Sequence, residues 1–68
     1  MATIGTHIKQ RRKLLKVTQR QLADLSGVGI NTLTKIEKDQ ANPTLEILQR
    51  ILDTLGLELS VSLKKSNE

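Results

Sequence analysis

The sequence predicts a mostly α-helical domain of four helices, followed by one β-strand near the C-terminal end. Apolar residues recur every three or four positions in four segments, as they do along the buried face of a helix. Over residues 57–63 the apolar residues strictly alternate with polar ones, which is typical of a strand. With 68 residues and no internal linker, the chain is expected to form one domain over residues 1–68, ending in a solvated tail at residues 64–68.

The first two helices are defined by their apolar spacing and their caps. The first is expected over residues 4–15, where Ile4, Ile8 and Leu15 share one face. The second begins after Thr18, because Thr18 and Gln21 have the spacing of a capping box, in which each side chain bonds the backbone of the other. Gly27 ends this helix as a left-handed C-cap.

The third and fourth helices follow short connections. The third is expected over residues 30–38, directly after the turn Val28-Gly29, and a loop over residues 39–43 follows it. Thr44 can cap the fourth helix over residues 45–55, which Gly56 terminates.

Composition restricts the chemistry available to the chain. There is no cysteine and only one histidine, His7, so a disulfide, a thiolate metal site and a nucleophile–histidine pair are not expected. Aromatic residues are absent, which argues against binding single strands by base stacking. The net charge of +4 favours phosphate-bearing partners. We therefore expect a cytoplasmic protein without a cofactor, without a membrane span and without enzymatic activity.

Residues 19–38 have the pattern of a helix-turn-helix, in which two helices cross steeply through a very short turn. Ala23 is small where the helices meet, and Gly27 permits the turn. The shared core of the motif is expected to consist of Leu22, Val28, Leu33 and Ile36.

In this motif the sequence resembles the Cro/repressor family of helix-turn-helix proteins, also called the XRE family. The resemblance covers roughly residues 4–56, and it rests on Arg12, Thr18-Gln19, Leu22-Ala23, Gly27-Val28, Leu33, Ile36-Glu37 and Pro43-Thr44-Leu45. It implies a compact repressor-type DNA-binding domain whose second motif helix lies in the major groove.

Carried over to this sequence, the resemblance implies that Ile30, Asn31, Thr34 and Lys35 read base edges. Asn31 can bond adenine, Lys35 can reach guanine, and Ile30 can contact a thymine methyl group. Thr32 is expected to face the phosphates. Alternatively, the polar residues form an ordinary solvated face, and Ile30 belongs to the core beside Val28.

The resemblance also implies phosphate contacts and a structural ion pair. The start of the second helix, with the Gln19 amide, is the expected phosphate anchor. Arg20 and Lys38 are further candidates, or are simply solvated. Arg12 and Glu37 correspond to a partly buried ion pair of the family.

Two positions depart from the family pattern. Lys16 and Asp39 stand where glycine is common, so both are expected to adopt a positive φ. Asp39 would also place a negative charge near the DNA backbone.

A lone strand leaves its backbone groups unpaired, so the strand over residues 57–63 needs a partner. We expect it to pair with its copy in a homodimer through Leu57, Leu59, Val61 and Leu63. A C-terminal strand in this position resembles the HipB-like antitoxins, whose partners are kinase-like toxins.

The leading hypothesis is a dimeric transcriptional repressor that binds an inverted repeat in a double-stranded DNA operator and serves as the antitoxin and autorepressor of a toxin–antitoxin operon. The alternative is a protein-interaction module that neutralises a partner toxin through its C-terminal strand, with DNA binding secondary. An adjacent gene for a kinase-like protein would favour the antitoxin interpretation.

Overall fold

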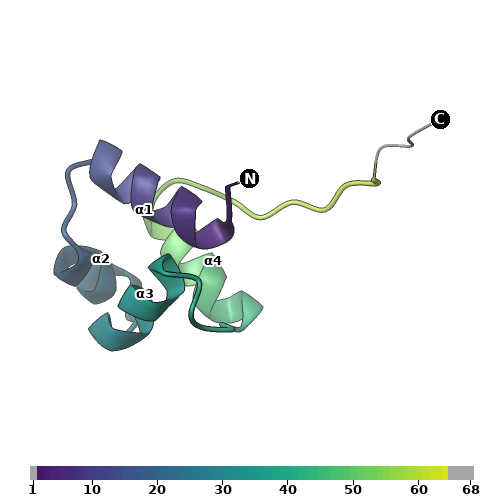
Figure 1. Ribbon diagram of the computed structural model, residues 1–68. Coiled ribbons are helices and arrows are strands. Elements are labelled where there is room, and N and C mark those ends of the chain that lie inside the picture. The colour runs from purple at the N-terminus through teal and green to yellow at the C-terminus, as the bar shows by residue number, and fades with distance from the viewer. Residues whose placement is uncertain (1, 65–68) are drawn as a thin grey trace.

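The structure is a computed structural model that describes residues 2–64. This part of the chain contains four helices, α1 (Ile4–Leu14), α2 (Gln19–Ser26), α3 (Ile30–Glu37) and α4 (Leu45–Thr54) (Figure 1). The four predicted helices are confirmed, with ends that differ from the expected ones by about one residue.

Three of the helices begin at a threonine whose hydroxyl accepts a backbone N–H of the first turn. These caps are Thr3 for α1, Thr18 for α2 and Thr44 for α4. At Thr18 both halves of the predicted capping box are formed, because its backbone N–H also donates to Gln21 Oε1 at 2.9 Å. The third helix, α3, follows Gly29 without a side-chain cap. Local sequence therefore sets the starts of three helices, and the turn sets the start of α3.

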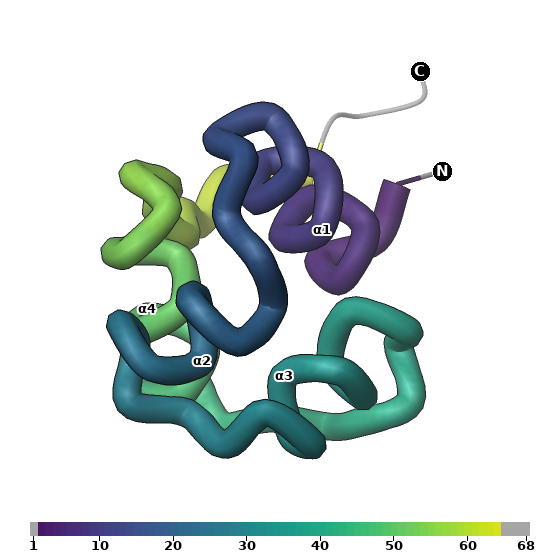
Figure 2. Tube along the Cα trace, turned by 90° about the vertical axis from the view of Figure 1, so that its left-hand side faces the viewer, coloured from purple at the N-terminus to yellow at the C-terminus, as the bar shows by residue number. Residues whose placement is uncertain are grey.

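The helices enclose one apolar core. Helix α2 packs on both α3 and α4, and α1 packs on α3. Figure 2 shows α1 above α2 and α3. The buried apolar residues are Ile8, Leu22, Ala23, Val28, Leu33, Ile36, Leu48, Ile51, Leu52 and Leu55. Every helix contributes to this core, so the position of α3 is fixed from several sides.

Gly5 allows α1 to lie directly against the end of α3. A Cβ atom at this position would collide with the carbonyl oxygen of Ile36, and it would lie 2.6 Å from Asp39 Oδ1. Only glycine fits this approach without a shift of the backbone. This requirement is not visible in the local sequence, because both obstructing atoms come from a segment more than thirty positions away.

The two non-glycine positions expected to have positive φ are confirmed. Lys16 and Asp39 both have φ of 58°. A lysine in this left-handed region costs about 1 kcal/mol relative to glycine. The Asp39 carboxylate is tied to the start of α1, since the Thr3 hydroxyl donates to its Oδ2 at 2.6 Å. The negative charge expected near DNA is thus directed at the N-terminal end of α1, where a helix dipole favours it.

The strand predicted over residues 57–63 is not formed within the part of the chain that the structure describes. Leu57 is still attached to the helices, because its N–H donates to Leu52 O at 2.8 Å and its side chain packs on the core. The following residues run as an extended segment away from the helices (Figure 1). A strand exists through pairing, and no segment among residues 2–64 offers this one an edge.

Candidate nucleic-acid interface

Helices α2 and α3 are joined through a tight turn at Gly27. This glycine has φ of 70°, which ends α2 in the left-handed conformation, and the N–H of Val28 donates back to Ala23 O at 3.0 Å. Leu22 and Ala23 of α2 are buried in the same core as Leu33 of α3. The turn and the shared core hold α3 at a fixed angle beside α2.

One side of α3 is anchored in the protein and the other faces solvent. The anchored side consists of Leu33, Ile36 and Glu37, all buried. The solvent side presents Asn31, Thr32 and Lys35, all exposed. These three predicted contact residues therefore lie on one accessible helix face, and their side chains form no intramolecular hydrogen bonds within residues 2–64.

Two of the other residues predicted to contact base edges are less exposed. Ile30 is half-buried and packs against the core. Thr34 is also half-buried, and its hydroxyl lies 2.9 Å from Ile30 O and 3.4 Å from Gln19 Oε1 as a donor to both. The hydroxyl of Thr34 is thus occupied inside the domain, unlike the side chains of Asn31 and Lys35.

The start of α2 presents unpaired hydrogen-bond donors. The capping box satisfies the N–H of Gln21, whereas the backbone N–H groups of Gln19 and Arg20 have no acceptor among residues 2–64. The side chains of Arg20 and Lys38 are exposed. Free amides at a positive helix end, with a basic side chain beside them, form an arrangement suited to a phosphate.

Arg12 and Glu37 form the expected ion pair. The guanidinium donates from Nε to Glu37 Oε2 at 2.8 Å and from Nη2 to Oε1 at 3.0 Å, and its Nη1 donates to Val17 O at 2.9 Å. The two side chains are only 10% and 2% exposed. This bidentate pair links α1 to the last residue of α3, so its role in the domain is structural.

Arg11 has a role that the sequence analysis missed. Its Nε donates to Leu55 O at 2.9 Å, next to the end of α4, where a cation is favoured by the helix dipole. The signal was present in the spacing, because Arg11 continues the row of Ile4, Ile8 and Leu15 on α1. One arginine of the basic run at residues 9–13 is therefore occupied in joining α1 to α4.

The charges are distributed unevenly along the described chain. Residues 2–44, which include the helix-turn-helix, contain eight basic and three acidic residues. Residues 45–64 contain two basic and three acidic residues. Five of the eight basic residues and none of the acidic ones lie at residues 4–17, so the excess of positive charge belongs to α1 and the turn after it, while residues 18–44 contain three basic and three acidic residues.

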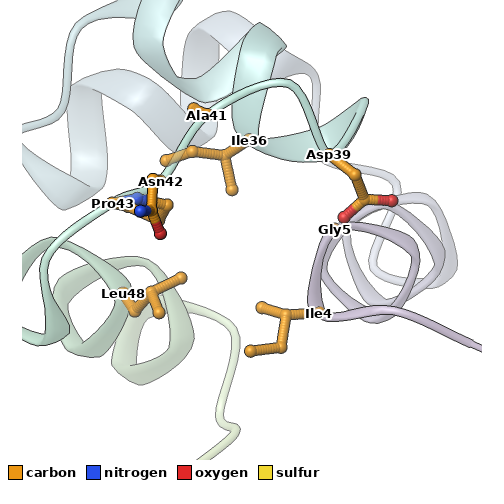
Figure 3. Close-up of a pocket in the computed structure, with 8 residues that line it drawn as sticks. All are labelled: Ile4, Gly5, Ile36, Asp39, Ala41, Asn42, Pro43 and Leu48. Atoms are coloured by element: carbon orange, nitrogen blue, oxygen red, sulfur yellow. The ribbon is translucent and has the colours of Figure 1, made fainter.

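A shallow pocket lies between the start of α1, the loop after α3 and α4 (Figure 3). Its walls are mostly apolar, and the Asp39 carboxylate extends across its edge towards Gly5. The residues that line it are Ile4, Gly5, Ile36, Asp39, Ala41, Asn42, Pro43 and Leu48.

Within residues 2–64 no three histidine, cysteine or acidic side chains gather as a metal site would need. No helix of the same part of the chain is long and apolar enough to cross a membrane.

The fold and this exposed helix define a helix-turn-helix domain. The helix-turn-helix family HTH_3 matches residues 8–61, and the chain belongs to this family. The resemblance inferred from the motif residues is thereby confirmed at the level of the family. The HipB-like branch is not confirmed.

Several relatives are named as regulators of transcription. The immunity repressor protein of Bacillus phage phi105 is 40% identical over 58 residues, which cover 85% of this chain and 40% of the phage protein. An uncharacterised HTH-type transcriptional regulator of Haemophilus influenzae is 46% identical over 50 residues, covering 74% of this chain and 51% of that protein. The chain thus spans about half or less of the length of these two relatives. Such regulators are not enzymes, which agrees with the expectation from composition.

A solved structure gives a direct comparison of the fold. The regulator of biofilm formation SinR, in complex with DNA, is similar with a TM-score of 0.76 and 33% identity. The match covers 82% of this chain and 90% of the SinR chain. The compact four-helix architecture of this chain is therefore that of a DNA-binding regulator.

Proposed function

We propose that this chain binds double-stranded DNA in a sequence-specific manner, as the DNA-binding domain of a transcriptional repressor. The observation that supports this function is the geometry of α3. Its inner side is buried in the core, while Asn31, Thr32 and Lys35 stand together on its exposed side. The first turns of this helix enter the major groove, and α2 crosses the phosphate backbone.

Each exposed residue of α3 has a defined role in this proposal. Asn31 forms two hydrogen bonds with adenine, and Lys35 donates to the O6 or N7 of guanine. Ile30 keeps its packing on the core and offers its outer edge to a thymine methyl group. Thr32 lies towards the phosphates, and Thr34 contributes mainly by supporting its neighbours.

The phosphate contacts come from the start of α2 and the end of α3. The free N–H groups of Gln19 and Arg20, together with the Gln19 side chain, hold one phosphate. The side chains of Arg20 and Lys38 add charge without reading sequence. These contacts fix the position of the domain on the duplex, and α3 then selects the bases.

Replacement of Lys35 by alanine tests the role of α3. We expect Lys35→Ala to weaken binding to a duplex selected from a random pool by about tenfold or more, because a base contact is worth about 1–3 kcal/mol. The preference for guanine at one position should relax in the same variant. Fluorescence anisotropy with a labelled duplex measures both effects.

Arg50→Ala provides the matched control for Lys35→Ala, because it removes the same charge from an exposed site on α4. Arg50 forms only an exposed pair with Glu46 at 3.4 Å, so its loss leaves the fold intact. Equal losses of affinity in both variants would mean that net charge alone, and not α3, governs binding.

A homodimer is the second part of the proposal. Beyond Leu57, the extended segment exposes Leu59, Val61 and Leu63, and the last two are 101% and 96% exposed. An unpaired strand of this kind exposes apolar side chains and free backbone N–H and C=O groups, and pairing with a second copy of the chain would satisfy them. Two such domains, joined by their strands, would read the two halves of an inverted repeat.

Replacement of Val61 by aspartate tests this dimer. We expect Val61→Asp to shift the protein to a monomer in sedimentation velocity, because it places a charge in the paired strands. Binding to an inverted repeat should weaken about a hundredfold, through the loss of the second linked site, while binding to one half-site stays unchanged. The isosteric variant Val61→Thr serves as the control. A wild-type monomer would contradict the dimer and leave the DNA-binding proposal in place.

The same exposed segment favours a second candidate function, docking on a partner protein. In this version residues 57–63 add a strand to the edge of a partner's sheet, and the antitoxin role with a kinase-like toxin is the form predicted from the resemblance. Mixing the chain with the product of a neighbouring kinase-like gene, followed by size-exclusion chromatography, tests it. A complex that Val61→Asp abolishes would support this role, and separate elution of the two proteins would contradict it.

A further inference from the structure

The side-chain amide of Gln19, the first residue of α2, is held by two residues of α3. Its Nε2 donates to Glu37 Oε1 at 3.0 Å. Its Oε1 lies 3.4 Å from the donating hydroxyl of Thr34. Gln19 itself is half-buried and Glu37 is almost completely buried, so these contacts form inside the corner between the two helices.

The chemistry of Glu37 determines which way the amide points. An ionised carboxylate only accepts hydrogen bonds, so the NH₂ end of Gln19 must face Glu37. A flipped amide would place Gln19 Oε1 about where Nε2 is now, 3.0 Å from a carboxylate oxygen, with no proton between them. The same flip would turn the NH₂ end towards the hydroxyl of Thr34, whose oxygen can accept as well as donate, so Glu37 alone selects the observed orientation.

Glu37 therefore has two distinct partners. Its Oε1 accepts from Arg12 Nη2 and from Gln19 Nε2, both at 3.0 Å. The contact with Arg12 joins α1 to α3, whereas the contact with Gln19 joins the end of α3 to the start of α2. The first contact is part of the buried ion pair, and the second holds the half-buried side chain of Gln19.

We propose that Glu37, assisted by Thr34, is a positioning residue that orients the Gln19 amide for a DNA phosphate. One Nε2 proton is fixed on Glu37, and the other joins the free backbone N–H groups of Gln19 and Arg20 as a donor. Because Glu37 is the last residue of α3, the phosphate contact is held at a fixed position relative to the bases that α3 reads. This inference rests on the proposed DNA-binding function.

The free protein already permits a test of the orientation. In a ¹⁵N-labelled sample, the two side-chain amide protons of Gln19 should resonate far apart, with one shifted by the bond to Glu37. Joint replacement of Arg12 and Glu37 by methionine, which removes the acceptor together with its buried charge partner, should bring them to the values of a solvated glutamine, and Thr34→Val should do so in part while the fold remains. Solvated values for Gln19 in the wild-type protein would overturn the proposal.

A double-mutant cycle tests the effect on DNA. We expect Gln19→Ala and the joint replacement of Arg12 and Glu37 by methionine each to weaken duplex affinity about threefold to tenfold, equally for the selected and an unrelated sequence, because each removes the oriented Gln19 amide. In the Gln19→Ala background, the joint replacement of Arg12 and Glu37 should have no further effect. Affinities are measured well below the melting temperature of each variant, so that unfolding does not contribute.

Variants of Thr34 distinguish an effect on the orientation of Gln19 from an effect on base preference or on folding. Thr34→Val should reduce affinity for all sequences about twofold to threefold, only when Gln19 is present, and Thr34→Ser should restore it. A change in sequence preference in Thr34→Val would instead assign Thr34 to the bases. If the protein with both Arg12 and Glu37 replaced does not fold, this series and the spectrum of Gln19 still decide the question.

The outcomes distinguish this inference from the function on which it rests. Additive losses in the cycle would overturn the positioning role while leaving DNA binding by α3 in place. If the wild-type chain binds no duplex, the proposed function and the phosphate role fall together, and the spectrum of Gln19 tests only the amide orientation. Non-additive losses of affinity in the cycle, together with an unchanged affinity in Arg50→Ala, would support both the positioning role and the DNA-binding function.

Discussion

Replacement of Glu37 by alanine is expected to lower the free energy of unfolding by about 3–5 kcal/mol, the cost of removing one partner of a buried ion pair. Arg12 would keep its bond to Val17 O but lose both bonds to the carboxylate, and it would remain buried with an uncompensated charge. A domain of this size has a total stability of roughly 3–10 kcal/mol. Much of the Glu37→Ala protein should therefore be unfolded at 25 °C, as urea denaturation followed by circular dichroism will show.

Two controls identify the cause of this loss. Arg50→Ala breaks an ion pair whose side chains are 49% and 76% exposed, so it should cost less than about 0.5 kcal/mol. Replacing Arg12 and Glu37 together by methionine removes both charges and keeps the volume, so it should recover most of the stability. A Glu37→Ala protein as stable as Arg50→Ala would show that the pair does not hold α1 against α3.

Replacement of Gly5 by alanine is expected to have the second-largest effect on stability. Helix propensity alone favours alanine over glycine by up to about 1 kcal/mol. The added methyl group, however, would collide with the backbone carbonyl of Ile36, which cannot rotate away as a side chain can. Overpacking of this kind costs about 1–3 kcal/mol, so the net result should be a loss of about 1–2 kcal/mol.

Gly29→Ala is the matched control for Gly5→Ala. Gly29 has φ of −61°, which alanine adopts freely, and an added methyl group would lie 3.8 Å from its nearest neighbour, Thr32 Oγ1. Its stability should stay within about 0.5 kcal/mol of the wild type. A Gly5→Ala protein that melts at a higher temperature than the wild type would contradict the close contact between α1 and α3.

The helices were predictable because their signals are local. Thr18 and Gln21 lie three positions apart, and their capping box forms as the spacing indicated. The positive φ of Lys16 and Asp39 followed from the resemblance, because glycine is common at both positions in the family. The need for Gly5 was not predictable from the local pattern, since it depends on a backbone atom of Ile36 brought there by the fold.

The strand expected over residues 57–63 could not be decided from the local pattern alone. Alternation of apolar and polar residues indicates that a segment favours an extended backbone. Pairing also requires the edge of another strand, which this single chain does not supply within residues 2–64. Leu57 nevertheless packs on the core, so the start of the segment is fixed while its outer part stays exposed. The prediction was therefore wrong for the isolated chain and remains a proposal for the dimer.

The candidate site was predictable in its outline and less so in its detail. Helical spacing correctly separated the exposed Asn31 and Lys35 from the buried Leu33 and Ile36. It did not reveal that the hydroxyl of Thr34 is occupied within the domain, because that depends on the crossing of two helices. The resemblance to repressors supplied the pair of Arg12 and Glu37, whose distance in sequence hides their contact.

Titration of the ¹⁵N-labelled chain with its selected DNA duplex tests the central claim most directly. If the exposed side of α3 enters the major groove, the largest changes in backbone and side-chain resonances should occur at Asn31, Thr32 and Lys35 and at the start of α2. The resonances of Arg50 on α4 should stay in place. Changes confined to residues 57–64 or to α4, with the α3 signals unmoved, would contradict the account.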